Sequence, residues 1–373
     1  MKVLLHLLIV FIFAVLPGSG CCRNNYNLLL LGDLHYDAPE FHDNRIMQFK
    51  EHVPYMQGVM NKDGNFSLRN HTFWVTEAKA ISHKNIKLNT QMWQTYMPQL
   101  LTNAACTAKE NNALYILQLG DIIHGDCGRF DLHQKNLQQA VDTLDKYFTA
   151  PVLTVCGNHD PRGPHGQEAW DKTMIPYLKK IVPDISETGA NYHIRIGKDL
   201  FYFHDLMKPD LDYMEKVFNE NPDTRYTFFI THVLLMPMDR GSFNNILADD
   251  FHRIFKLLES RNAIVLGGHT HQIALTEYYN QVSERRITQF VLNSTVRRPD
   301  KEFSFHPGTD ARKKNVQTEE FYVGLWEKYF AGKLKTTLHT NGSGHALLRV
   351  ADDGVWVDYY NIGQEKPYTF KLR

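Results

Sequence analysis

Gly157-Asn158-His159-Asp160 is the stretch of this sequence around which the rest of the chain is organised. Four other short polar signatures accompany it: Asp33-x-His35, Gly120-Asp121, His232 and Gly268-His269-Thr270-His271. Each signature follows a short apolar run, and the runs are Leu28 to Leu31, Ala113 to Leu119, Val152 to Val155, Thr227 to Ile230, and Ala263 to Leu266. Short apolar runs that stop at polar residues and glycine are typical of buried β-strands that end in loops.

The side chains after these runs are carboxylates, imidazoles and one amide. Because open α/β sheets bind ligands outside the carboxyl ends of their strands, we expect the five loops to meet at one edge. Carboxylate oxygen and neutral imidazole nitrogen are ligands for Zn, Mn or Fe. The set is too large for one ion that keeps open positions. It suits two ions that hold the attacking and leaving oxygens of an in-line displacement.

In this order the signatures resemble those of the calcineurin-like metallophosphoesterases, whose pattern is D-x-H, G-D, G-N-H-[DE], a single His, and G-H-x-H. The matching core, from Asp33 to His271, covers roughly two-thirds of the chain. The resemblance implies an α/β fold, a layered β-sandwich flanked by helices (α/β/β/α). Strand patterns that alternate with helical patterns along the chain also favour a layered α/β fold.

The resemblance also implies a role for each matching residue. Seven side chains would be ligands of two divalent ions, three on the first, three on the second and one bridging: Asp33, His35 and His271; Asn158, His232 and His269; and Asp121. His159 would not be a ligand. It would face the scissile phosphate and protonate the leaving oxygen, and Asp160 would orient it.

The expected function is hydrolysis of small phosphate mono- or diesters. A hydroxide shared by the two ions would attack phosphorus, with His159 as the general acid. His124 and Arg162 are candidate substrate contacts; a turn residue and a solvated arginine are the alternatives. A non-catalytic extracellular binding protein with the same fold is the second function class. The complete ligand set favours the enzyme. The identity of the two ions is not decided among Zn, Mn and Fe.

Residues 1–20 have the features of an export signal. Lys2 is followed by an apolar run from Val3 to Leu16 and by Gly18-Ser19-Gly20, a small-residue cleavage site. A membrane-spanning helix needs about 20 apolar residues, and this run is shorter. We therefore expect a secreted or exported chain of one domain, residues 21–373, without a transmembrane segment. A lipid anchor at Cys21 is the alternative to free secretion.

Charge, cysteines and glycosylation sequons bear on nucleic-acid binding and on covalent modification of the chain. The sequence has 41 basic and 41 acidic residues and no long basic run, so a nucleic-acid partner is not indicated. Among five cysteines, Cys106 with Cys127 is the only pair considered for a disulfide, and Cys156 is expected in the core. Four N-glycosylation sequons begin at Asn65, Asn70, Asn293 and Asn341, and Asn293 is the least favourable because it ends a strand pattern.

The segment from about 36 to 88 is an insertion, because far more residues separate Asp33 from Asp121 than one crossover needs. It follows His35 directly, and so long a segment is usually functional or has its own structure. It is either one wall of the substrate pocket or a surface elaboration. A helix is expected over Leu88 to Asn112, kinked or divided at Pro98.

Overall fold

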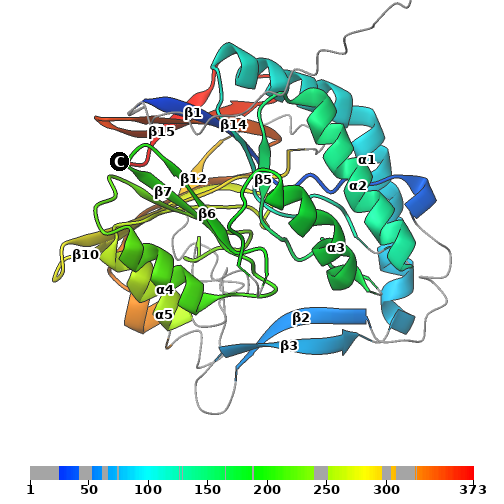
Figure 1. The fold of residues 1–373 in the computed structure, drawn as a ribbon, viewed down its shortest axis with the longest axis horizontal. Coiled ribbons are helices and arrows are strands. Elements are labelled where there is room, and N and C mark those ends of the chain that lie inside the picture. Colours follow the sequence, from blue (N-terminus) through cyan, green and yellow to red (C-terminus); the bar gives the residue numbers. More distant parts are fainter. Residues whose placement is uncertain are drawn as a thin grey trace, which may run out of the picture.

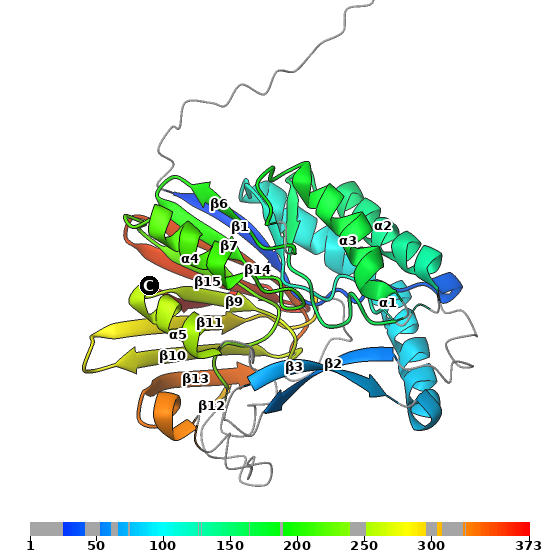
Figure 2. The same ribbon diagram turned by 60° about the horizontal axis from the view of Figure 1, so that its bottom comes forward.

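The structure is a computed structural model, which describes residues 25–41, 53–60, 66–73, 75–125, 127, 129–163, 165–186, 189–238, 251–295, 304–307, 324 and 326–373. Two mixed β-sheets form its centre, and helices cover the outer face of each (Figures 1 and 2). The layers therefore follow the order helix, sheet, sheet, helix. This arrangement confirms the expected α/β fold.

The first sheet has the strand order β16-β15-β14-β1-β4-β5. Its strands are β1 (Tyr26–Leu31), β4 (Ile116–Gln118), β5 (Val152–Thr154), β14 (Gly344–Ala351), β15 (Gly354–Asn361) and β16 (Tyr368–Lys371). β4 runs parallel to both β1 and β5. The carboxyl ends of these three strands therefore meet at one edge.

The second sheet has the order β12-β13-β10-β11-β9-β8-β7-β6. Its strands are β6 (Tyr192–Ile196), β7 (Asp199–Phe203), β8 (Thr227–Ile230), β9 (Ile264–Gly267), β10 (Ile273–Asn280), β11 (Arg285–Val291), β12 (His306–Pro307) and β13 (Leu334–Thr340). β7, β8 and β9 are parallel neighbours. Their carboxyl ends form the corresponding edge of this sheet.

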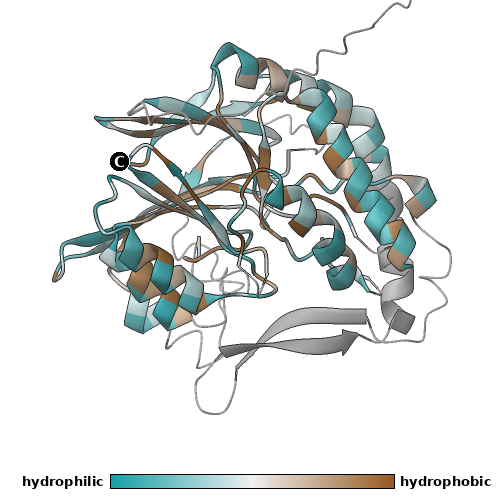
Figure 3. Cartoon of the chain, viewed as in Figure 1, coloured by the Kyte–Doolittle hydropathy of each residue, from teal (hydrophilic) through white to brown (hydrophobic). Residues whose placement is uncertain are grey.

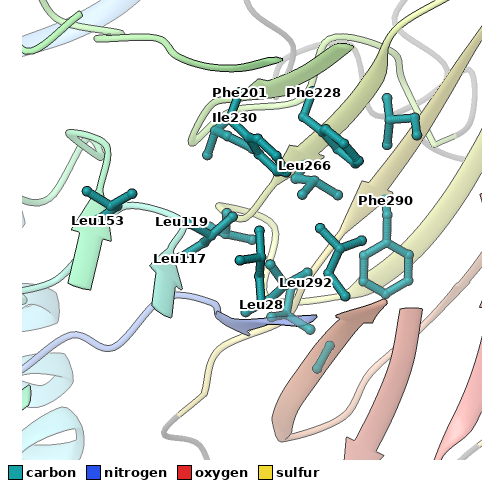
Figure 4. Close-up of a cluster of buried hydrophobic side chains, with 14 of the residues drawn as sticks. Leu28, Leu117, Leu119, Leu153, Phe201, Phe228, Ile230, Leu266, Phe290 and Leu292 are labelled. Atoms are coloured by element: carbon teal, nitrogen blue, oxygen red, sulfur yellow. The ribbon is translucent and has the colours of Figure 1, made fainter. Parts of the chain in front are cut away.

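Strand β1 shows why the runs before the polar signatures are apolar throughout. Leu28 and Leu30 belong to the core between the sheets, whereas Leu29 and Leu31 belong to the cluster under the helices. Successive side chains of a strand point to opposite faces, so a strand covered on both faces needs apolar residues at every position. Figure 4 shows Leu28 among leucines and phenylalanines of both sheets.

Within the part of the chain that the structure describes, three α-helices cover the first sheet and two cover the second. The first group is α1 (Val75–Glu110), α2 (Phe130–Tyr147) and α3 (Gly166–Lys179), and the second is α4 (Leu211–Glu220) and α5 (Phe251–Ser260). Met214 and Phe255 pack with Phe229 and Val265 of the second sheet. The inner strands are largely hydrophobic, and the helices carry polar residues on their outer faces (Figure 3). Such a pattern is typical of helices that cover a sheet with one face and meet solvent with the other.

Helix α1 differs from the prediction at its start. It begins at Val75 instead of Leu88, and Pro98 lies inside it without dividing it. Trp93, Leu100 and Leu101 are side chains of this helix that are buried against the rest of the protein. They belong to the C-terminal half, which is where the apolar periodicity predicted a helix.

The insertion has secondary structure of its own. It holds a short 3-10 turn (Pro39–Phe41) and an antiparallel hairpin of β2 (Val53–Met60) and β3 (Phe66–Phe73). Both views show the hairpin beside the N-terminal half of α1 (Figures 1 and 2). A π-helical turn (Trp326–Phe330) precedes β13 in the C-terminal part of the chain.

Candidate metal centre

The loops after five parallel strands carry the predicted ligand residues. Asp33 follows β1, Asp121 follows β4, and Asn158 follows β5 in the first sheet; His232 follows β8 and His269 follows β9 in the second. Backbone contacts join the two sets of loops.

The amide of His269 lies 3.1 Å from each carboxylate oxygen of Asp33 and donates to that carboxylate. His232 Nδ1 lies 2.9 Å from the Leu119 carbonyl, to which it donates. The two sheet edges therefore form one site.

Several ligand candidates have an uncommon backbone conformation. Among the described residues, eight that are not glycine have a positive φ, and four of these are His35, Asp121, His269 and His271, with φ between 49° and 72°. The left-handed region is sparsely populated by residues with a Cβ, and such residues cluster at functional sites. The fold holds these four side chains in place at the expense of local backbone strain.

Asp33, His35 and His271 form the first cluster, with ligand atoms within 4.8 Å of one another. The Nε2 atoms of His35 and His271 lie 2.9 Å apart. His271 Nε2 lies 3.7 Å from Asp33 Oδ2. Imidazole nitrogens and a carboxylate oxygen therefore converge on one point, as the ligands of a divalent ion do.

Asp121, His232 and His269 form the second cluster, which Asn158 completes. Asn158 Oδ1 lies 2.8 Å from His269 Nδ1 and 3.1 Å from His232 Nε2. Asp121 Oδ2 lies 3.2 Å from His232 Nε2 and 3.8 Å from His35 Nε2 of the first cluster. Asp121 therefore stands between the two clusters of candidate ligands.

Burial sets the charge states of these side chains. It lowers the pKa of His35 well below the ordinary value and that of His269 to about 3, so both are neutral imidazoles, the form that binds metal. Burial would also lower the pKa of His232, but the Asp121 carboxylate outweighs it and raises this pKa to about 10. Burial raises the pKa of Asp33 to about 7. Closely packed carboxylates and imidazoles of this kind suit divalent cations, whose positive charge would offset the negative charge of the buried carboxylates.

His159 lies beside the clusters, and each of its two ring nitrogens makes a hydrogen bond. Its Nδ1 lies 2.8 Å from the carbonyl oxygen of His124 and must carry a proton, because a carbonyl only accepts. Its Nε2 accepts from Arg162 Nη1 at 2.9 Å. The backbone amide of His159 donates to Asp121 Oδ1 at 2.7 Å. The ring is therefore fixed relative to the central carboxylate.

Asp160 makes different contacts from those expected. Its carboxylate accepts from the amides of Gly157, Asp121 and Ile123, at 2.7, 3.0 and 3.1 Å. The carbonyl of His124, not the Asp160 side chain, orients the His159 ring. The physical reason is that the Asp160 side chain is buried beneath the loop, where it satisfies amides that no strand pairs with.

His124 and Arg162 both lie at the site. One ring nitrogen each of His35, His124 and His159 also lies within 4.8 Å of the other two, so His124 adjoins the first cluster. Arg162 Nη2 donates to the His124 carbonyl at 3.3 Å. Gln118 and Gln289, which the motifs did not indicate, are two fully buried amides that bind loop backbone. Gln118 is visible in the sequence as a polar residue within an apolar run, whereas Gln289 follows arginine and threonine residues in β11 and is not.

Other expectations have mixed outcomes. The predicted disulfide is wrong, because Cys106 is exposed, Cys127 is buried and both are free, while Cys156 is buried as expected. Asn293 is fully buried and donates to the hydroxyl of Tyr359, which agrees with its rank among the sequons. Within the described residues, no helix has the length and apolar character needed to cross a membrane. The export segment and Cys21 lie outside those residues.

Comparison with known proteins places the chain in a family. The sequence model of the calcineurin-like phosphoesterases matches residues 26–273. No curated protein matches it in sequence. A solved dimetal phosphatase from Danio rerio is 12% identical, with a TM-score of 0.52 over 93% of this chain and 99% of that one.

Two further structures resemble the chain more weakly. PhoD is 12% identical with a TM-score of 0.49, over 73% of this chain and 65% of that one. GAP50, the anchor in the inner membrane complex of Plasmodium, is 10% identical with a TM-score of 0.48, over 94% of this chain and 89% of that one. The likeness to the Danio rerio structure concerns the fold alone, whereas the family match spans the strands and loops that carry the candidate ligands. The chain belongs to the calcineurin-like phosphoesterase family.

Proposed function

We propose that this protein hydrolyses small phosphate mono- or diesters at a dinuclear metal centre, with His159 as the general acid. Membership of the family supports a metal-dependent phosphoesterase. The observation that carries the proposal is the convergence of two clusters of ligand atoms on Asp121. A non-catalytic binding protein with this fold is the alternative, and an intact general acid beside an intact ligand set argues against it.

The residues of the site fit two divalent ions. Asp33, His35 and His271 would hold one, and Asn158, His232 and His269 the other, with Asp121 between them. When bound, the ions would lower the pKa of a shared water and offset negative charge on the phosphoryl oxygens. The mixed nitrogen and oxygen donors suit Zn, Mn or Fe equally.

His159 would act through Nε2, because Nδ1 is held by the carbonyl of His124. This Nε2 accepts from Arg162 in the structure, so it would carry the acid proton once the guanidinium has turned to the substrate phosphate. A positioned general acid typically contributes about 10²–10⁴-fold to the rate. Arg162 lies next to that Nε2. Its guanidinium would bind oxygens of the substrate phosphate, for which its planar donors are suited. His124 lines the same side of the site and fixes the ring through its backbone.

Asp160 would act as a positioning residue. Its carboxylate joins the amide of Gly157, which precedes Asn158, to the amide of Asp121. These two hydrogen bonds connect the loop after β4 with the loop after β5. Because Asp160 contacts no ring of the site through its carboxylate, its effect on catalysis would pass through Asp121 and Asn158.

The first experiment would measure bound metal and turnover on a chromogenic phosphate monoester and a chromogenic phosphate diester, using the chain from Cys21 onward. The expected result is about two ions per chain, with activity on either probe that a chelator abolishes. The ratio of the two rates then distinguishes a phosphatase from a phosphodiesterase. A chain without bound metal and without metal-dependent turnover would exclude the enzyme and favour the binding protein.

His159→Ala tests the assignment of the acid. The variant should retain both ions and lose about 10²–10⁴-fold in turnover, most strongly on esters with poor leaving groups. Asp121→Ala should lose both ions, because a bridging ligand serves each. His252→Ala, which removes an exposed histidine on α5, is the matched control and should behave as the unaltered chain. Loss of metal in His159→Ala would make His159 a ligand and not an acid.

We propose export as the setting of this activity, with residues 1–20 removed and a lipid on Cys21 as the alternative. The apolar segment with its small-residue cleavage site supports this proposal. Mass spectrometry of the mature chain is the test. An N-terminus at Cys21 without added mass indicates free secretion, a diacylglycerol-sized increase indicates an anchor, and a retained Met1 would contradict both.

A further inference from the structure

A polar side chain lies beneath the metal centre, inside the hydrophobic core. Gln118 is the last residue of β4, is fully buried, and stands between Leu117 and Leu119, both of which belong to the core between the sheets (Figure 4). Burying an amide without partners costs free energy on the order of a few kcal/mol. Its contacts therefore show what it does there.

All the hydrogen-bonding capacity of the Gln118 amide is used. Its Nε2 donates to the carbonyl oxygens of Gly32 at 3.3 Å and of Gly120 at 2.6 Å. Its Oε1 accepts from the amide of Gly120 at 3.1 Å and from the hydroxyl of Thr154. An amide has two donors and two acceptor positions, and these four contacts fill them.

The two glycines that Gln118 holds directly precede two of the ligand candidates. Gly32 precedes Asp33, and Gly120 precedes Asp121. Both loops have left the strand ladder at this point. Beyond the two glycines, the amides of Leu34 and His35 donate to the carbonyl of Asp121, and the side chain of Gln118 joins the loop backbones at the glycines themselves.

Little space exists for these loops to shift on their own. A Cβ added at Gly120 would lie 2.5 Å from His232 Nδ1, so the backbone of Gly120 packs directly against the His232 ring. A Cβ added at Gly32 would lie 1.7 Å from the carbonyl oxygen of Asn293. The position of each glycine therefore sets the position of the side chain that follows it.

We propose that Gln118 is a positioning residue of the metal centre, which fixes the separation of Asp33 and Asp121 by holding the backbone of Gly32 and Gly120. The inference rests on the proposed function, because it assumes that these carboxylates bind divalent ions. Groups that orient metal ligands typically change metal affinity by about 10–100-fold when they are removed. Gln118 should act at this level although it lies outside the ligand set.

A second arrangement in the core provides a matched control. The hydroxyl of Tyr192, in β6 of the second sheet, donates to the carbonyl of Thr154 at 2.8 Å. Tyr192 therefore belongs to the same chain of buried polar contacts, but it touches neither glycine. Tyr192→Phe removes one buried hydrogen bond from that chain and leaves the contacts of Gln118 with both loops in place.

The experiment measures Mn²⁺ binding by titration calorimetry on chelator-treated protein, well below the unfolding temperature, together with the Tm with and without Mn²⁺. Gln118→Met keeps the volume of the side chain and removes all four hydrogen bonds. Gln118→Glu keeps the shape and replaces the donor group by oxygen, which faces two carbonyls. Both variants should bind Mn²⁺ about 10–100-fold more weakly and gain less Tm from it.

Tyr192→Phe should have a lower Tm, because it loses a buried hydrogen bond worth about 1 kcal/mol, and an unchanged Mn²⁺ affinity. Equal affinity in the unaltered chain and in the folded Gln118 variants would overturn the proposal. An equal loss of affinity in Tyr192→Phe would also overturn it, since the effect would then be general destabilisation. If Gln118→Met does not fold, Gln118→Glu decides.

These outcomes are distinct from a failure of the proposed function. If the unaltered chain itself binds no Mn²⁺, Zn²⁺ or Fe²⁺, the dinuclear centre is refuted, and the role of Gln118 with it. If the unaltered chain binds two ions and hydrolyses a phosphate ester, the proposed function stands whatever the Gln118 variants do.

Discussion

A single methyl group at Gly157 should disable the metal centre. The Cβ of Gly157→Ala would lie 2.2 Å from both the amide nitrogen and Oδ1 of Asp121. Ordinary van der Waals contact begins at 3.4 Å, so one of the two loops must move by about 1.2 Å, the difference between these distances. The φ of Gly157 lies outside the left-handed region, so alanine adds no backbone strain there. The effect is purely steric.

Neither loop can accommodate this shift freely. The amide of Asp121 donates to Asp160, and its carbonyl accepts from the amides of Leu34 and His35 at 3.0 and 2.9 Å. The other loop carries Asn158 and His159. A misplacement of about 1 Å can cost about 10²-fold in rate, and overpacking a core costs about 1–3 kcal/mol of stability. We expect both, with weaker binding of both ions because Asp121 lies between them.

The assay measures metal content after dialysis, kcat/KM on the better chromogenic probe, and Tm. Gly324→Ala is the control, because no atom of the residues that the structure describes lies within 4 Å of the Cβ it would add. It should retain both ions and full turnover. The steric argument fails if Gly157→Ala retains two ions and a kcat/KM within about twofold of the unaltered chain, against the expected loss of about 10²-fold.

Two further predictions concern stability away from the metal centre. Burial lowers the pKa of His345 to about 4, and its Nε2 lies 2.8 Å from the hydroxyl oxygen of Thr107. The unfolded chain takes up this proton near pH 6.5, so the stabilisation from this group is complete above pH 6.5 and falls by about 3 kcal/mol as the pH drops towards 4. In His345→Gln the free energy of unfolding from urea titrations should therefore fall less steeply over that range, and a parallel pH profile would contradict the reasoning. Arg225 Nε donates to Asp199 at 3.0 Å, and Asp199 is fully buried. Arg225→Met leaves this carboxylate without its cation and should cost about 3–5 kcal/mol by the same measurement, whereas a loss below about 1 kcal/mol would show that solvent reaches the carboxylate.

Local pattern was sufficient for the strands and for the residues at their ends. A strand buried on both faces must be apolar along its length, and a loop that carries metal ligands must be polar, so the boundary between them is visible in the sequence. The order of the five signatures then indicated which residues converge. The structure places Asp33, His35, Asp121, Asn158, His232, His269 and His271 together at one edge of the sandwich.

Contacts between loops were not predictable in this way. The resemblance to the family implied that Asp160, which follows His159 in the sequence, orients the His159 ring. In the structure Asp160 binds backbone amides, and a carbonyl from the loop after β4 holds the ring. Such partners depend on where distant backbone lies in space, which no local pattern records.

The sequence by itself therefore determined the strands, because a strand buried on both faces is apolar along its length, and its five signatures, through their resemblance to a family pattern, indicated the layered fold and the candidate ligand residues. Only the tertiary structure decided that Cys106 and Cys127 stay apart, that α1 begins at Val75, and that Gln118 supports the two aspartate loops. The physical reason is that a buried hydrogen bond is satisfied by whichever group the fold brings within reach, and that group can lie far away in the sequence.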